Sequence, residues 1–540
     1  MSKWQGRSRE RAVQTEKSSL QSSSSSDKSA APPRSLLRSR LLVGAVAIGL
    51  VVLSSPNQWV HWFPGALVGL APLMYWGWEA TWWQRVRVSA AIWFGICLLV
   101  FVPDVFSVES YGWAEMLGGL VVSPVVPLFY VLASATSLQL TRRCPLWLRP
   151  IAIAAVWTSF DSVMAIVKFP LPLHYGACIF DFTLAIQIAD ITGVWGVTFL
   201  AILSNATLAA IARAVPRDRW RAAFLGGAVW GLALTYGSWR LPAFVAAPVS
   251  TYTIGSVQQM AWLESDRSWK YRAERYGELQ AMTRDALDRG AQLVVWPEGA
   301  LRAQVAGTEL ERFVFKPLLP LPDGVQLITG SSEPDPRTQD LPWEQQQFIN
   351  TALLYDESGD IRDRYGKQWL FQYFETQRFA PSPEGYKPLL AKDPMGRLGV
   401  MVCLESVMPE PSRELVRAGA QSLIAISDDS WFGKSNWPIL HASLSVFRAV
   451  ELRRSFAFVN NTGGNLIVDP SGTIQQRGTF WQRGAVTGEM QVRDEVTLAA
   501  RWGDWLAIAT VAIALSLAAW ESYGALKSLD SRQTCQNSLL

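Results

Sequence analysis

Three residues in the C-terminal half of the chain have side chains that together could carry out acyl chemistry. Cys403 ends the apolar run RLGVMVC, Glu298 follows the apolar run LVVW, and Lys367 lies in RYGKQWL. A thiol attacks a carbonyl only after its proton is removed, and the oxyanion that then develops needs a positive donor. A carboxylate, a thiol and an ammonium supply these roles, so we predict Glu298, Lys367 and Cys403 as catalytic residues.

Each of the three residues also has a simpler interpretation when it is taken alone. A lone cysteine at the end of an apolar strand is usually a small buried hydrophobe, and a single glutamate or lysine is usually a solvated charge. A papain-like site would need a histidine beside the thiol. The only histidine between residues 245 and 498 is His441, on an expected helix, and we do not favour it as a catalytic residue.

Short apolar runs that alternate with amphipathic segments must position these side chains. The alternation is typical of an α/β layered fold with buried strands. Reacting groups in such folds gather at the carboxyl ends of the strands, where Glu298 and Cys403 both lie. We expect helices at 266–289, 409–418 and 437–454. The expected strands are 251–258, 291–296, 325–332, 348–356, 397–403, 421–427, 455–461 and 464–469.

The rest of the chain is too apolar for an ordinary soluble protein. Of its 540 residues 49% are hydrophobic and only 17% are charged, with 26 tryptophans. A membrane span needs about 20 apolar residues. Eight stretches of this kind are present. An isolated one lies near the C-terminus, in WGDWLAIATVAIALSLAAWESYGAL. The seven that precede it are 39–56, 60–79, 87–106, 112–140, 149–168, 192–212 and 221–241.

The distribution of basic residues between these stretches predicts one topology. The loops after the second, fourth and sixth stretches are rich in arginine, whereas 56–58 and 104–110 hold no lysine or arginine and 168–191 holds only Lys168. Basic loops stay in the cytoplasm, so both termini are expected inside, and the α/β part outside, in the periplasm of a bacterium. The predicted parts are a polar, disordered, Ser-rich tail (1–38), a seven-helix membrane domain (39–244), the outer domain (245–498), a last transmembrane helix (499–525) and a tail (526–540).

Composition disfavours several other classes of function. The net charge is only +4, which does not suggest a nucleic-acid partner. Five scattered cysteines and three histidines show no spacing typical of a disulfide framework or a metal site. Asp161 stands within an expected span, where an acid is a candidate functional residue, although a carboxylate that is hydrogen-bonded inside the helix bundle is the simpler interpretation.

These segments, in this order, resemble the nitrilase (carbon–nitrogen hydrolase) superfamily, whose members use a Glu–Lys–Cys triad. Residues 427–474 are similar to one branch of it, the bacterial apolipoprotein N-acyltransferases. In that family a WFG run, here 431–433, precedes a helix with an R-A-x-E-x-x-R pattern, here 448–454. A strand with an N-N/T-G pattern comes next, here 460–463, and the membrane segment 168–208 is also similar.

The resemblance covers about residues 40–525 and implies a role for each matching residue. Cys403 would be the nucleophile, Glu298 the general base and Lys367 the stabiliser of the oxyanion. Glu375 matches a second essential glutamate, and Glu405 matches the glutamate of a Cys-x-Glu segment that could orient the lysine or the substrate. Pocket-shaping residues would be Trp431, Phe432 and Gly433.

The chain also departs from the family pattern at several positions. It reads FQYFE (371–375) where a Pro-Phe-Gly-Glu run is usual, and Leu404 stands where an aromatic residue is common. The first strand reads VQQMAW in place of a Gln-x-Asn pattern, and Asp161 stands where a glutamate is typical. None of these departures removes a member of the triad.

The resemblance implies a multi-pass helical membrane bundle of about eight spans and a nitrilase-like αββα sandwich. The implied activity is transfer of an acyl chain from a phospholipid to a diacylated apolipoprotein through a cysteine thioester, by a monomer in the cell inner membrane, without cofactor or metal. The hydrophobic tail of each substrate would lie in the lipid bilayer. Two alternatives are a membrane-tethered amidase that uses water and a transporter or receptor with an outer ligand-binding domain. Exposed aromatic residues of 367–374 would dip into the membrane interface.

Overall fold

The computed structural model describes residues 34–57, 59–106, 124–166, 174–242, 248–261, 269–301, 308–371 and 375–537. The chain divides into a unit Met1–Val46 and a unit Ala47–Leu540. Helix α2 (Arg34–Ser54) begins in the first unit, and the elements that follow it belong to the second. Residues 1–33, most of the tail that was expected to be disordered, lie outside the described part.

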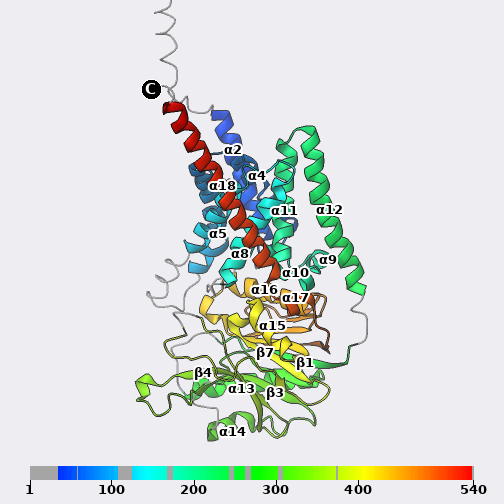
Figure 1. The fold of residues 1–540 in the computed structure, drawn as a ribbon. Helices are drawn as coiled ribbons and strands as arrows, with labels where there is room; N and C mark the ends of the chain where they lie inside the picture. The colour runs from blue at the N-terminus through cyan, green and yellow to red at the C-terminus, as the bar shows by residue number, and fades with distance from the viewer. Residues whose placement is uncertain are drawn as a thin grey trace, which may run out of the picture. The chain divides into compact units, whose positions relative to one another are not determined.

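The N-terminal portion of the second unit is helical, as expected (Figure 1). Its elements after α2 are α3 (Pro64–Val68), α4 (Ala71–Gly77), α5 (Trp82–Phe106), α7 (Val125–Leu140), α8 (Arg149–Ile166), η1 (Tyr175–Ile179), α9 (Thr183–Ile186), α10 (Ala189–Thr192), α11 (Val194–Arg213) and α12 (Pro216–Arg240). Two more helices, α17 (Leu498–Trp502) and α18 (Trp505–Asn537), follow the last strand.

Three stretches of these helices, among the described residues, are long and apolar enough to cross a membrane: Trp82–Val100, Val194–Arg213 and Trp505–Lys527. The apolar helices Leu41–Ser54 and Val125–Leu140 are shorter. The expected bundle of eight spans is therefore not confirmed. The fourth expected span, 112–140, also begins in residues 112–123, which lie outside the description.

The expected second span, 60–79, is not one helix but two, α3 and α4, with Pro64 as the first residue of α3 and Pro72 as the second residue of α4. A broken helix leaves backbone groups that need other partners in an apolar environment. Asn205 of α11 supplies them: its amide donates to the carbonyl of Ala66 at 2.7 Å, and its side-chain oxygen accepts the Leu70 N–H at 2.8 Å.

The C-terminal portion confirms the expected α/β fold. It contains two six-stranded sheets, in the orders β12-β1-β2-β3-β4-β5 and β11-β10-β9-β8-β7-β6. Strands β1, β2 and β3 run parallel, as do β7, β8 and β9. The strands are β1 (Ser250–Gln258), β2 (Leu293–Val295), β3 (Gln326–Pro334), β4 (Phe348–Tyr355), β5 (Ile361–Gly366), β6 (Leu389–Leu390), β7 (Arg397–Val402), β8 (Ser422–Ser427), β9 (Phe456–Asn460), β10 (Leu466–Val468), β11 (Ile474–Arg477) and β12 (Gly484–Val492).

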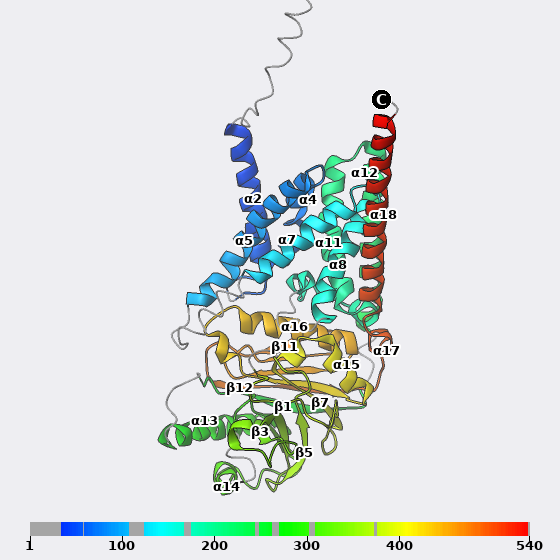
Figure 2. The same ribbon diagram turned by 60° about the vertical axis from the view of Figure 1, so that its left-hand side comes forward.

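The alternation of side chains along β2 creates the layers of this portion. Leu293 and Val295 belong to the core that the two sheets share, whereas Val294 and Trp296 pack in the cluster that includes α13 (Trp269–Asp288) and α14 (Glu309–Phe315). On the far side, α15 (Pro409–Arg417) and α16 (Trp437–Leu452) cover the second sheet (Figure 2). The result is the αββα order that was expected.

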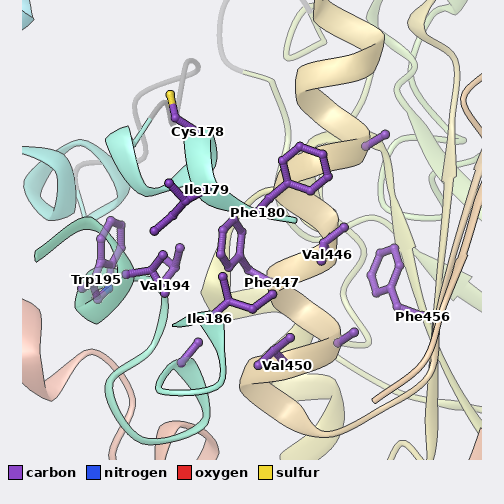
Figure 3. Packing of buried hydrophobic residues seen from close by; sticks show 14 of the residues in the cluster. Cys178, Ile179, Phe180, Ile186, Val194, Trp195, Val446, Phe447, Val450 and Phe456 are labelled. Atoms are coloured by element: carbon purple, nitrogen blue, oxygen red, sulfur yellow. The ribbon is translucent and has the colours of Figure 1, made fainter. Parts of the chain in front are cut away.

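Helix α16 joins the sheets to the helical portion. Figure 3 shows Phe447 and Val450 of α16 against Ile186 and Val194, while Phe456 of β9 packs on the other side of α16. Three buried residues near the C-terminal end of α16 take part in these contacts with the helical portion. Glu451, paired with Arg448 at 2.9 Å, accepts the first N–H of α11 at Val194, and the Arg453 guanidinium pairs with Asp190 of α10 at 2.7 Å.

Candidate active site

Three strand ends bring the predicted catalytic residues to one place. Glu298 follows β2 in a turn, Lys367 directly follows β5, and Cys403 directly follows β7. The Lys367 ammonium lies 3.9 Å from a Glu298 carboxylate oxygen. The charges of Glu298 and Lys367 both act on the Cys403 thiol, so the three groups converge although they are far apart in the chain.

The Lys367 side chain is fully buried, and its main partner is Glu375. The Nζ atom lies 2.7 Å from Glu375 Oε1, and the other Glu375 oxygen accepts the Phe371 N–H at 2.7 Å. Burial alone would lower the pKa of the ammonium, but the neighbouring acidic groups, above all Glu375, outweigh it and leave the pKa above its usual value. Lys367 therefore remains a cation throughout the physiological pH range.

The Glu298 carboxylate is held by one donor on each oxygen. The Asn350 amide donates to Oε1 at 2.7 Å, and the Asp428 backbone N–H donates to Oε2 at 3.0 Å. The pKa of Glu298 is raised to about 7, mainly by burial and also by the charges of Glu375 and Asp428, against the lowering effect of Lys367. A carboxylate with this pKa can accept a proton near neutral pH.

Cys403 stands in a strained backbone turn. Its φ of +56° is in the left-handed region, which a residue with a Cβ rarely adopts, and strain of this kind is found mainly at functional sites. Burial and then the Glu298 charge raise the pKa of the thiol well above its usual value, against Lys367. The resting thiol is therefore protonated, and its proton must be removed by a neighbouring base during attack.

Glu405 was expected to orient either the lysine or the substrate, and the structure gives it a backbone role. Its buried carboxylate accepts the N–H groups of Gln368 and Trp369 at 2.8 and 3.0 Å, and that of Val402 at 2.9 Å. The Tyr365 hydroxyl donates to the same carboxylate. Glu405 thus fixes the segment after Lys367 against the strand end that carries Cys403.

The expected pocket residues are only partly described. Phe432 stacks on Trp437 with a centroid distance of 5.4 Å, and Gly433 has a φ of +59° that ends the turn η5 (Asp429–Phe432). The side chain of Trp431 lies outside the description, and so do residues 372–374 of the expected interfacial loop. Asp161, the acid within an expected span, is buried and accepts the Tyr175 N–H at 2.8 Å, which matches its simpler interpretation.

Sequence reasoning missed the two residues that hold Glu298. Asn350 is a polar residue in the largely buried strand β4, and Asp428 directly follows β8. The position of each was a usable signal, since an amide within a buried strand needs a partner and strand ends line the site. In the part of the chain that is described, no group of three or more His, Cys, Asp or Glu side chains could hold a metal ion.

The layered sheets and the chemistry at their edge define the class of protein. The αββα portion is a carbon–nitrogen hydrolase domain, and the family model of that description matches residues 253–499. A second model, described as the apolipoprotein N-acyltransferase N-terminal domain, matches residues 48–207. The chain therefore belongs to the apolipoprotein N-acyltransferase family.

Two relatives of the same family name agree with this assignment, and one solved structure is also similar. The apolipoprotein N-acyltransferase of Geobacter metallireducens is 29% identical over 358 residues, which cover 62% of this chain and 67% of that protein. The protein of the same name from Azotobacter vinelandii is 28% identical and covers 85% of this chain and 91% of its own length. A carbon–nitrogen hydrolase from Helicobacter pylori G27 aligns with 44% of this chain and 89% of its own, at 19% identity and a TM-score of 0.35.

Proposed function

We propose that the protein transfers an acyl chain from a membrane phospholipid to the N-terminal amino group of the diacylglyceryl-cysteine of apolipoproteins. The observation that carries the proposal is the convergence of Glu298, Lys367 and Cys403 in a chain whose two portions match the two models of this family. A thiol nucleophile allows the acyl group to be held as a thioester between donor and acceptor.

In the first step, Glu298 accepts the Cys403 proton while the sulfur attacks the ester carbonyl of the phospholipid. The oxyanion is stabilised by the Lys367 ammonium and by the backbone N–H of Leu404. The carbon–oxygen bond then breaks, Glu298 returns its proton to the departing oxygen, and a lysophospholipid leaves. Because burial holds the pKa of Glu298 at about 7, the same carboxyl group can serve as base and then as acid.

In the second step, the acceptor amine attacks the thioester carbonyl. Glu298 takes the proton that the amine loses, the carbon–sulfur bond breaks, and the proton returns to Cys403. The products are an amide on the lipoprotein and the free thiol. Glu375 holds Lys367 throughout both steps, and Glu405 keeps the two strand ends in register.

The site also fits a membrane setting. The proposal includes a topology with eight spans, both termini in the cytoplasm and an outer domain over 245–498 in the periplasm. It also includes a monomeric enzyme in the inner membrane. Donor and acceptor are both anchored in the bilayer, so a domain at its outer surface works where they are concentrated. Trp431, Phe432 and Gly433 would shape the entrance, and no cofactor or metal is required by the steps above.

The test uses the full-length protein in detergent with an acyl-labelled phospholipid and a diacylated lipopeptide. We expect the lipopeptide to gain the mass of one acyl group, and the protein to carry a labelled thioester when the acceptor is omitted. Cys403→Ala should abolish both and leave a folded membrane protein. Cys144→Ala, which removes another free cysteine outside the site, is the matched control.

Other outcomes would point to the alternatives. A labelled thioester on the Cys403→Ala protein would refute the assignment of the nucleophile. Release of ammonia from small amides without any phospholipid would favour a membrane-tethered amidase. Flux of a solute into proteoliposomes that survives Cys403→Ala would favour a transporter.

A further inference from the structure

A buried chain of three polar side chains lies directly behind Cys403 and has no part in the steps above. The imidazole Nδ1 of His441, on α16, lies 3.1 Å from Asp429 Oδ1, and its Nε2 lies 2.8 Å from the Ser406 hydroxyl. Ser406 and His441 both contact the nucleophile's own peptide: the Ser406 hydroxyl donates to the Cys403 carbonyl oxygen at 2.9 Å, and Nε2 lies 3.3 Å from that oxygen.

Asp429, the member of this series that lies farthest from Cys403, has hydrogen-bond donors on both of its carboxylate oxygens. The Ser427 hydroxyl donates to Asp429 Oδ1 at 3.0 Å, and the Asn460 amide donates to Oδ2 at 2.9 Å. The Asn460 oxygen in turn accepts the Asp429 backbone N–H at 3.0 Å. With donors already on each of its oxygens, the Asp429 carboxylate is fixed in place, and its contact with Nδ1 sets the orientation of the His441 ring so that Nε2 faces Ser406 and the Cys403 carbonyl oxygen.

The Cys403 carbonyl belongs to the same planar peptide unit as the Leu404 N–H. In a trans peptide the carbonyl and the N–H point in opposite directions. Ser406 and His441 hold the oxygen on the α16 side, so the Leu404 N–H must point to the opposite side of the turn. Leu404 is the second residue of the turn η4 (Cys403–Ser406), where an N–H has no acceptor within the turn.

We propose that Asp429, His441 and Ser406 are positioning residues for the oxyanion hole, an inference that rests on the proposed function. They anchor the carbonyl of the Cys403–Leu404 peptide, which aims the Leu404 N–H at the substrate oxyanion. Hydrogen bonds to the carbonyl also polarise the peptide and make its N–H a stronger donor. These three residues thus act on the transition state through the backbone and do not touch the substrate.

Two other roles for these residues conflict with the contacts. The Asp–His–Ser distances are those of a serine nucleophile, but Ser406 is fully buried and its hydroxyl is committed to the Cys403 carbonyl. His441 as the base for the thiol, the papain-like alternative, would need its Nε2 on the sulfur. That nitrogen instead faces Ser406 and the carbonyl oxygen.

The test compares Ser406→Ala, His441→Leu and His441→Gln with the wild-type protein, using a phospholipid labelled with ¹³C at the ester carbonyl. The rate of thioester formation is measured without acceptor, and the infrared stretch of the labelled thioester carbonyl reports the hydrogen bonds to its oxygen. Ser443→Ala is the matched control, because Ser443 is also buried on α16 but donates only within its own helix, to Ile439.

We expect Ser406→Ala and His441→Leu to slow acylation by about 10- to 100-fold, at or below the cost of losing one whole oxyanion donor. The thioester carbonyl stretch should rise toward its solvent frequency in both, with little change in KM. His441→Gln, which can place an N–H near the carbonyl, should recover part of the rate. The Ser443→Ala protein should match the wild type in rate and stretch.

Three outcomes would overturn the inference. Acylation at the wild-type rate in folded Ser406→Ala and His441→Leu proteins would do so, and so would a slower rate with an unchanged carbonyl stretch, which is the mark of a purely structural role. If these variants do not fold, the wild-type protein alone decides: a thioester carbonyl stretch that is not lower than the frequency in solvent would overturn the inference. Absence of any thioester on the wild-type protein would instead overturn the proposed function.

Discussion

Replacing Glu375 by glutamine removes one negative charge beside Lys367 and leaves an amide of similar size. At present the ammonium is shared unequally, with Nζ 2.7 Å from Glu375 and 3.9 Å from Glu298. The Glu375 charge also raises the pKa of Glu298, a smaller effect than burial. Without that charge, Lys367 pairs with Glu298 alone, and both changes favour the ionised form of Glu298.

The size of the effect follows from Coulomb's law. Two like charges about 6 Å apart repel by about 2–3 kcal/mol at an effective dielectric constant of about 20. Since 1.36 kcal/mol corresponds to one pKa unit, we expect the pKa of Glu298 to fall by about 1.5–2 units, from about 7 to about 5–5.5. A weaker base removes the thiol proton less well, so the maximal acylation rate should fall about fivefold.

The assay is the rate of thioester formation on Cys403 over a range of about pH 5 to 9. Only ionised Glu298 is active, so the wild-type rate should fall as pH drops below about 7, and the Glu375→Gln rate should hold until about 5–5.5. Glu384→Gln is the control. Glu384 lies outside the site, where its carboxylate is 3.7 Å from the ammonium of the half-exposed Lys387. An unchanged or higher midpoint for Glu375→Gln would refute the assignment of Glu298 as base.

Further substitutions test the framework around the site. A Cβ on Gly330 would lie 2.6 Å from the Glu298 Cα, so Gly330→Ala should displace Glu298 and slow acylation by about 10- to 100-fold, as measured by thioester formation. Asp190→Asn leaves the buried Arg453 without its counter-charge and should lower the free energy of unfolding by about 3–5 kcal/mol in detergent. Glu405→Gln weakens several charge-assisted hydrogen bonds and should cost about 3 kcal/mol in the same denaturation assay.

The parts of the site that sequence reasoning found are those marked by local patterns. Cys403 and Glu298 directly follow or closely follow apolar strands, and the ends of such strands can be located from the sequence. The contacts of Glu298 with Asn350 and Asp428 join residues that are distant in the chain, and no local pattern predicts them. The contacts of His441 with Asp429 and Ser406 were missed for the same reason, because no local pattern joins these residues.

The fold was anticipated least well where the residues have a weak pattern. Strand β12 reads GAVTGEMQV, whose polar and small residues give little periodicity, and it forms because β1 offers a complete antiparallel partner. The expected span at 60–79 reads as one apolar stretch by composition, yet it is divided into α3 and α4, and Asn205 supplies partners for backbone groups on each side of the break. In both places a tertiary partner decided the structure, and hydropathy alone could not identify that partner.

The pairing of β1 with β12 has a consequence for how the enzyme is made. Ser250 pairs with Val492, so one of the earliest strands to be synthesised finds its neighbour only when nearly all of the portion has emerged. Until then one edge of β1 presents open backbone groups, which other chains can bind. Completion of this sheet is thus a late event of biogenesis, almost simultaneous with synthesis of α18, and a nascent chain that stalls before residue 484 leaves a sheet open to aggregation or proteolysis.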